Sequence, residues 1–159
     1  MKPKLTLLCG LPGSGKSTLA KEMQSQKNTE TFSSDKLLIR TYGTDFPPEK
    51  FDEYQKTLRE SIKKKTTELL RAGVSVVLDF GFWTKAERTE YIELARQEQA
   101  DSEIIFFDVS QTTLLKRIET RNTHLKHDEL LVTPEMLTRF SKTFEPPTED
   151  ETTIYRIEE

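Results

Sequence analysis

The chain has 159 residues and a formal net charge of −3, and charged side chains make up 32% of it against 34% hydrophobic residues. This length predicts one domain, spanning residues 1–159, that can bury a sizeable core. No apolar run approaches the length of a membrane span, and the negative balance argues against a general nucleic-acid-binding surface. Cys9 is the one cysteine, and the first residues leave no room for a signal peptide, so we expect a cytoplasmic protein.

Five short apolar runs alternate with helical patterns along the chain, which predicts an α/β fold with a mainly parallel sheet. The last run is expected to form an edge strand. The runs that we expect to be strands span residues 5–9, 31–33, 74–79, 104–109 and 153–157.

Capping signals and apolar stripes predict the helices between these strands. A stripe that starts at Phe51 indicates a long helix, which Gly73 ends. Thr84 begins a capping-box pattern for the next helix, and Ser110 is expected to cap another. Thr133 followed by proline opens a short helix near the C-terminus.

The most informative stretch runs from Gly10 to Ser17 and fits the phosphate-binding pattern G-x-x-x-x-G-K-[ST] at every fixed position. Glycines let successive backbone N–H groups converge on phosphate oxygens, and the following helix adds its positive N-terminal end. Lys16 can reach the β- and γ-phosphates while the Ser17 hydroxyl binds Mg²⁺. We expect a nucleoside triphosphate to contact Gly10, Leu11, Pro12, Gly13, Ser14, Gly15, Lys16, Ser17 and Thr18.

Two carboxylates follow neighbouring strands, at the edge of a parallel sheet where ligands collect. Asp35 comes after the second apolar run and Asp79 ends the third. Such groups could hold Mg²⁺ directly or through water, or accept a proton from an attacking hydroxyl. The metal role suits Asp79 best. The alternatives are that Asp79 caps a turn and that Asp35 caps a helix beginning at Lys36.

Basic and aromatic side chains supply further candidates. Arg117 and Arg121 are spaced i, i+4 on a helix, so both could neutralise charge on a transferred phosphoryl group, or pair with surface acids. The aromatic residues of the segment 80–83, which ends in Trp83, could line an acceptor pocket or belong to the core. The lysine run at 63–65 is expected to be a solvated helix face.

Nearly the whole chain resembles the small P-loop kinases that include polynucleotide 5′-hydroxyl kinases, zeta toxins and chloramphenicol phosphotransferase, a group that also goes by the name of AAA-type ATPase domain. The matching features, in order, are the motif at 10–17, Ser34-Asp35 with Arg40, Asp79 with Arg88, and Phe107-Asp108-Val109 followed by Arg117 and Arg121.

This resemblance implies a P-loop NTPase three-layer sandwich with strand order 2-3-1-4-5 and a short helical lid at about 117–133. It implies that Asp35 is the general base and that Arg117 and Arg121 contact the phosphates from the lid. It places the acceptor near Asp35 and Arg40. We also expect Asp79, Trp83 and Arg88 at the acceptor, although the aromatic segment 80–83 stands where the polynucleotide kinases carry a polar pair.

We therefore expect an ATP-dependent kinase that uses Mg²⁺ and phosphorylates a hydroxyl group. A small-molecule acceptor is favoured over a nucleic-acid 5′ end, because basic residues are limited to the lid and one helix. A nucleotide-driven switch or hydrolase without an acceptor is the alternative from another class. The absence of an N-K-x-D sequence argues against GTP in either case.

Overall fold

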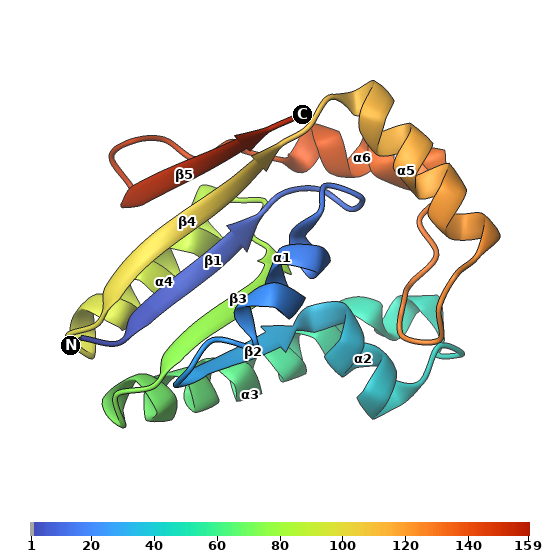
Figure 1. Ribbon diagram of the computed structural model, residues 1–159. Helices are drawn as coiled ribbons and strands as arrows, with labels where there is room; N and C mark the ends of the chain where they lie inside the picture. The colour runs from blue at the N-terminus through green and yellow to red at the C-terminus, as the bar shows by residue number, and fades with distance from the viewer. Residues whose placement is uncertain (1) are drawn as a thin grey trace.

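Five strands form one sheet in the order β2-β3-β1-β4-β5, and every neighbouring pair is parallel (Figure 1). The computed structural model describes residues 2–159. The predicted sheet order is confirmed, and β5 lies at an edge as expected. The strands are β1 (Lys4–Cys9), β2 (Thr29–Ser33), β3 (Ser75–Gly81), β4 (Asp101–Asp108) and β5 (Thr153–Glu158).

Helices cover both faces of this sheet, which makes a three-layer arrangement. In Figure 1, α1 lies in front of the sheet, and α3 and α4 lie behind it. None of the helices among the described residues is both long and apolar enough to cross a membrane. The helices are α1 (Lys16–Met23), α2 (Ser34–Tyr42), the 3₁₀ turn η1 (Pro48–Lys50), α3 (Phe51–Arg71), α4 (Lys85–Gln97), α5 (Gln111–Thr123) and α6 (Pro134–Thr143).

The helix starts agree with the capping signals at most positions. Thr84 Oγ1 accepts a hydrogen bond from the Glu87 backbone N–H at 3.2 Å, as predicted, but the Glu87 carboxylate does not complete the capping box. It pairs instead with Arg59 on α3 at 3.1 Å. The start of α2 also differs from the alternative considered above, because Ser33 provides the cap and the helix begins at Ser34 rather than at Lys36.

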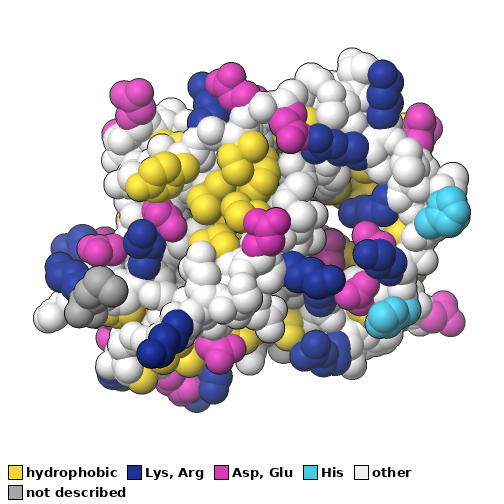
Figure 2. Space-filling model, in the orientation of Figure 1, with side chains coloured by type: hydrophobic (Ala, Val, Ile, Leu, Met, Phe, Trp, Pro, Cys, Tyr) yellow, Lys and Arg dark blue, Asp and Glu magenta, His cyan; other side chains and the backbone are white. Residues whose placement is uncertain are grey.

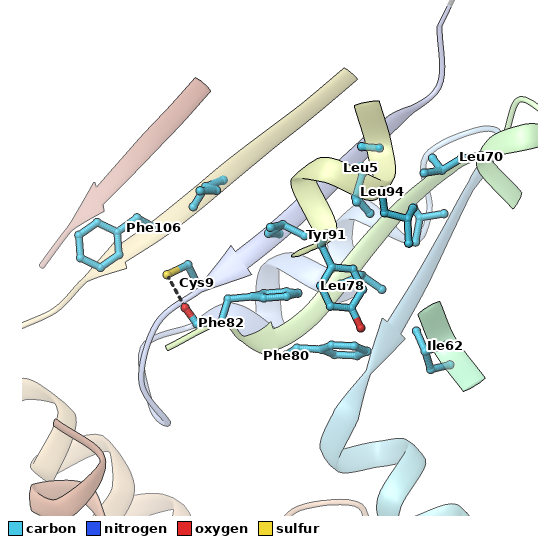
Figure 3. Close-up of a cluster of buried hydrophobic side chains, with 14 residues drawn as sticks. Leu5, Cys9, Ile62, Leu70, Leu78, Phe80, Phe82, Tyr91, Leu94 and Phe106 are labelled. Atoms are coloured by element: carbon cyan, nitrogen blue, oxygen red, sulfur yellow. Dashed lines mark hydrogen bonds between the residues drawn. The ribbon is translucent and has the colours of Figure 1, made fainter. Parts of the chain in front are cut away.

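The two faces of β1 show how alternation builds the core. Leu5 and Leu7 belong to the large cluster against α3 and α4, whereas Leu8 belongs to a smaller cluster with Ala20 of α1. Figure 3 shows the large cluster, in which Tyr91 of α4 packs edge-on against Phe82, with ring centroids 5.3 Å apart. A parallel strand buried on both faces needs such near-continuous apolar sequence.

The helices α5 and α6 form a separate layer beyond the carboxyl ends of the strands (Figure 1). They pack through a third apolar cluster that includes Leu114, Ile118 and Leu137. Leu11, from the loop after β1, packs against this cluster. The loop that carries the phosphate-binding motif is thereby held between the sheet and α5.

Candidate active site

The loop after β1 borders a cavity of about 570 Å³ at the carboxyl edge of the sheet, which we call the phosphate cavity. Figure 2 shows it as a hollow right of centre, where basic and acidic side chains meet. Gly13 and Gly15 adopt φ values of 84° and 106°, which favour glycine. The motif residues that line the cavity are Pro12, Gly13, Ser14, Gly15, Lys16, Ser17 and Thr18.

The first two motif residues support the loop from outside the cavity lining. The backbone N–H of Gly10 donates to the Gly81 carbonyl at 2.9 Å, and a Cβ at Gly10 would lie 2.7 Å from Ser14 Oγ. The Leu11 carbonyl accepts a hydrogen bond from Lys16 Nζ at 2.9 Å. The conformation of the loop is therefore held by its own backbone and by the end of β3.

Lys16 lies in the middle of the site and interacts with both strand-end carboxylates. Burial lowers the pKa of its ammonium group, while the charges of Asp79 and Asp35 raise it and so partly offset that effect. A lysine held between a glycine-rich loop and two carboxylates is placed to bridge phosphate oxygens.

Ser17 and Asp79 meet at the boundary between α1 and β3. Ser17 Oγ donates to Asp79 Oδ2 at 3.0 Å, and the Asp79 residue is only 6% exposed. One hydroxyl and one carboxylate beside a phosphate site match the oxygen ligands that Mg²⁺ takes, since this ion completes its shell with phosphates and water. The two predicted metal-side residues are thus brought together, and their donor set fits the ion.

Asp35 lies in the first turn of α2, on the wall of the phosphate cavity. Its side chain is exposed to that cavity, whose walls desolvate the carboxylate in part. This desolvation raises the pKa of Asp35, the charge of Lys16 opposes the rise, and the charge of Asp79 adds to it. A carboxylate with a raised pKa in a cleft is suited to accept a proton.

Arg117 and Arg121 of α5 both line the phosphate cavity. Arg117 Nη1 donates to the Gly13 carbonyl at 3.3 Å, and its guanidinium also pairs with Glu159. Arg121 Nη2 donates to the Leu130 carbonyl at 3.1 Å, and its Nε lies 3.9 Å from a Glu129 carboxylate oxygen. Both arginines are thus placed at the cavity and are bonded there to acceptors that phosphate oxygens could replace.

A second cavity of about 650 Å³, which we call the helix cavity, lies beside α3 and α4. Four residues line both cavities, so the two meet at a common wall. These four are Ser34, Asp35, Phe80 and Trp83.

The aromatic residues of the segment 80–83, at the end of β3, have different roles: some line a cavity and one belongs to the core alone. Trp83 lines both cavities, and its Nε1 donates to the Gly10 carbonyl at 3.1 Å. Phe80 lies in the core cluster and also forms part of the common wall. Phe82 is fully buried and belongs to the core alone.

Two predicted acceptor residues do not reach either cavity. Arg40 is exposed near the end of α2. Arg88 is fully buried, where it pairs with Glu151 at 2.7 Å and donates to the Phe82 carbonyl at 2.8 Å. The expected acceptor role of Arg88 is therefore wrong, because this buried side chain connects α4 to the turn before β5.

Burial raises the pKa of Cys9 to about 12, so this thiol stays protonated at neutral pH.

Polar residues of α3 also line the helix cavity, which the sequence patterns above do not predict. Gln55, Arg59 and Lys63 recur every four residues, so they share one face of that helix. This spacing was visible in the sequence, but what the face meets depends on α4. Lys63, which we expected to be solvated, is instead half-buried and pairs with Glu90.

The fold has clear relatives among solved structures. A candidate kinase from Chloroflexus aurantiacus is 16% identical with a TM-score of 0.78, covering 99% of this chain and 89% of that one. Kti12 from Chaetomium thermophilum, solved with ADP-AlF₃, is 15% identical with a TM-score of 0.72, covering 97% and 88%. A chain of the Pnkp1/Rnl/Hen1 RNA repair complex is 21% identical with a TM-score of 0.68, covering 92% and 48%.

Sequence comparison identifies the family. No curated protein matches the chain significantly. The family model described as AAA domain matches residues 5–147, which include the phosphate-binding loop, both strand-end carboxylates and both arginines of α5. The fold is that of P-loop nucleotide-binding proteins, and the structural relatives include kinases. This chain belongs to the AAA domain family of P-loop proteins.

Proposed function

We propose that this protein is an ATP-dependent kinase that transfers the γ-phosphoryl group of ATP to a hydroxyl. The observation that carries the proposal is the position of Asp35, which lies on the common wall of the phosphate cavity and the helix cavity. A hydrolase needs room for one water molecule on that side of the phosphates. A kinase needs a second cavity for an acceptor, with a base where the two cavities meet.

The phosphate loop and Lys16 would hold the triphosphate. Ser17 and Asp79 would hold Mg²⁺, which neutralises charge on the phosphate oxygens when it is bound. Arg117 and Arg121 would exchange their present carbonyl and carboxylate partners for oxygens of the transferred group. Each of these interactions would stabilise negative charge on the phosphate oxygens, and such stabilisation is the main requirement of phosphoryl transfer.

Asp35 would take the proton of the acceptor hydroxyl as its oxygen attacks the γ-phosphorus. The new P–O bond forms while the bond to the β-phosphate oxygen breaks, so ADP leaves with that electron pair. The raised pKa of Asp35 supports this role, because a base is most effective when its pKa approaches the working pH.

The lid of this kinase would span about 117–133, within a single domain of residues 1–159. Its closure would exclude water, which otherwise competes with the acceptor for the phosphoryl group. Arg40 is exposed on α2 and lines neither cavity. It would contact only an acceptor large enough to extend out of the helix cavity along α2. The buried thiol of Cys9 suits a reducing cytoplasm, where we place the protein.

Two other functions remain as alternatives. The likeness to Kti12, solved with ADP-AlF₃, keeps open a nucleotide-driven ATPase or switch without an acceptor. The likeness to a chain of an RNA repair complex keeps open a polynucleotide 5′-hydroxyl kinase. A small-molecule kinase is preferred over both, because the cavity beside Asp35 has the volume of a small-molecule site.

The fate of the γ-phosphate tests the proposal. Labelled ATP and Mg²⁺ would be incubated with the protein and a panel of hydroxyl compounds, and the products separated. We expect label in an organic phosphate ester, at a rate well above acceptor-free release, and no turnover by Lys16→Met. Label that appears only as inorganic phosphate, whatever acceptor is added, would establish the hydrolase instead.

A further inference from the structure

The helix cavity has a lining that selects among hydroxyl compounds. It holds about 650 Å³ between α3 and α4, within the usual range for small-molecule sites. Aromatic side chains form one part of its wall, and polar side chains of α3 form another. If the proposed kinase function is correct, this cavity is where the acceptor lies, and its lining determines the acceptor class.

The charges of the helix cavity oppose an anionic acceptor. Five carboxylates line it against three cationic side chains, which gives a formal balance of −2. Two of the three cations are already engaged across the helices, Arg59 with Glu87 at 3.1 Å and Lys63 with Glu90. Arg59 also donates to the Phe80 carbonyl at 3.3 Å. Phosphate binding relies on available Lys and Arg groups, and among the described residues this lining offers only Lys56 outside those two pairs.

One polar group in this lining has no partner. Gln55 Oε1 is buried and accepts no hydrogen bond from any part of the chain that the structure describes. A buried oxygen without a donor costs free energy, so such atoms are usually satisfied by a ligand or by water. Gln55 lies one helical turn from Arg59, on the face of α3 that lines the cavity. A rotation of the Gln55 side chain toward the cavity would let a hydroxyl or ammonium donor on the acceptor satisfy this oxygen.

The aromatic part of the lining suits a compact ring. Trp83 is half-buried, and its indole is fixed by the hydrogen bond from Nε1 to the Gly10 carbonyl at 3.1 Å. A fixed aromatic side chain packs well against the face of a sugar or a base. Trp83 packs against Phe140 on one side and lines both cavities together with Asp35, so a ring against the indole would share its cavity with the carboxylate.

We propose that the acceptor is a small, uncharged or cationic hydroxyl compound, bound in the helix cavity with a donor group on Gln55 and its ring against Trp83. A negatively charged sugar acid and a polynucleotide 5′ end are disfavoured by the same lining. This assignment makes Gln55 an acceptor-binding residue. It also makes Glu60, an exposed residue of α3 that lines the helix cavity, a determinant of acceptor charge.

Two matched pairs of probes test the charge preference. Thymidine and 5′-hydroxyl hexathymidylate present the same base and hydroxyl but differ in phosphates, and glucosamine and gluconate are of similar size but opposite charge. We expect transfer from ATP to thymidine or glucosamine at no less than tenfold the kcat/KM of the anionic member of the pair. Preference for hexathymidylate or gluconate would overturn the inference while the kinase function stood. Failure of all four probes to accept phosphate, with ATP hydrolysis intact, would overturn the kinase function itself.

Variants of α3 test whether Gln55 binds the acceptor. Gln55→Leu is expected to raise the KM for the accepted probe about tenfold, with a smaller change in the KM for ATP. Lys65→Leu, on the exposed side of the same helix, is the control and should match the wild type. An unchanged acceptor KM in Gln55→Leu would overturn the role of Gln55.

A charge reversal provides a second, independent variant. Glu60→Lys should shift the ratio of kcat/KM for glucosamine over gluconate about tenfold toward gluconate, because a cation then faces the cavity. Glu68→Lys makes the same change in net charge outside the cavity and should leave the ratio unaltered. An equal change of this kcat/KM ratio in the two variants would show that the lining of the cavity does not select acceptors by charge.

Discussion

Ser17 donates a hydrogen bond from its hydroxyl to Asp79 at 3.0 Å, which joins the first turn of α1 to the end of β3. The two residues are 62 positions apart in the sequence and meet only because β1 and β3 are neighbours. Parallel strands present their carboxyl ends at one edge, so a loop after one strand and a carboxylate on the next can share a ligand.

Loss of either partner should therefore weaken the use of Mg²⁺. Asp79→Asn is expected to lower kcat/KM about 100-fold and to raise the Mg²⁺ concentration needed for half-maximal activity, because it removes a charged oxygen ligand. Activity would be titrated with Mg²⁺ at saturating ATP. Ser25→Ala, which alters an exposed hydroxyl at the other end of α1, is the control. An unchanged Mg²⁺ titration in Asp79→Asn would remove Asp79 from the metal site.

The pH dependence of turnover should report the ionisation of the Asp35 carboxyl group. Desolvation raises its pKa above the ordinary value, so the carboxylate becomes protonated, and inactive as a base, at a higher pH than a free aspartate would. As the pH falls, kcat/KM should decline through that raised pKa, on a limb that lies above the ordinary aspartate position. Initial rates across a pH series at saturating Mg²⁺ measure it. A limb at the ordinary aspartate position would contradict the environment assigned to Asp35.

Arg121 should act on the chemical step. Its guanidinium lines the phosphate cavity and is positioned by the Leu130 carbonyl and by Glu129. Arg121→Gln is expected to reduce kcat about 100- to 1,000-fold, because a charge that stabilises the transferred group is lost. Steady-state kinetics would be compared with Arg96→Gln, an exposed arginine of α4. Wild-type kcat in Arg121→Gln would assign this arginine to the lid surface alone.

Arg88 should act on stability. Its side chain and that of Glu151 are 0% and 1% exposed, and two hydrogen bonds of 2.7 and 3.2 Å join them. Arg88→Met is expected to lower the free energy of unfolding by about 3–5 kcal/mol, because it leaves the Glu151 carboxylate buried without its cationic partner. Urea unfolding measures it.

The matched control for that experiment is the double variant Arg88→Met with Glu151→Leu. It removes both charges and should recover a large part of the loss. A loss below about 1 kcal/mol in the single variant would contradict the buried pair.

Much of the site could be predicted from the sequence, because its main features follow strand ends. The phosphate loop, Asp35 and Asp79 each come directly after an apolar run, and parallel strands bring such residues together. Arg88 was misassigned because its partner Glu151 lies 63 residues away, and no local pattern predicts that pairing.

The helix cavity was missed for a related reason. The spacing of Gln55 and Arg59 places them on one face of α3, but only the packing of α4 against that face shows that they line a cavity. Helical periodicity identifies a face and leaves its neighbour undetermined. The lining of a cavity between two helices is a tertiary property.

The role of Asp35 is the central claim, and Asp35→Asn tests it most directly. ATP binding would be measured at equilibrium and label transfer to the acceptor in a single turnover, both against the wild type. We predict that Asp35→Asn binds ATP within about threefold of the wild type while transfer falls by 100-fold or more. Transfer at the wild-type rate in Asp35→Asn would contradict the account.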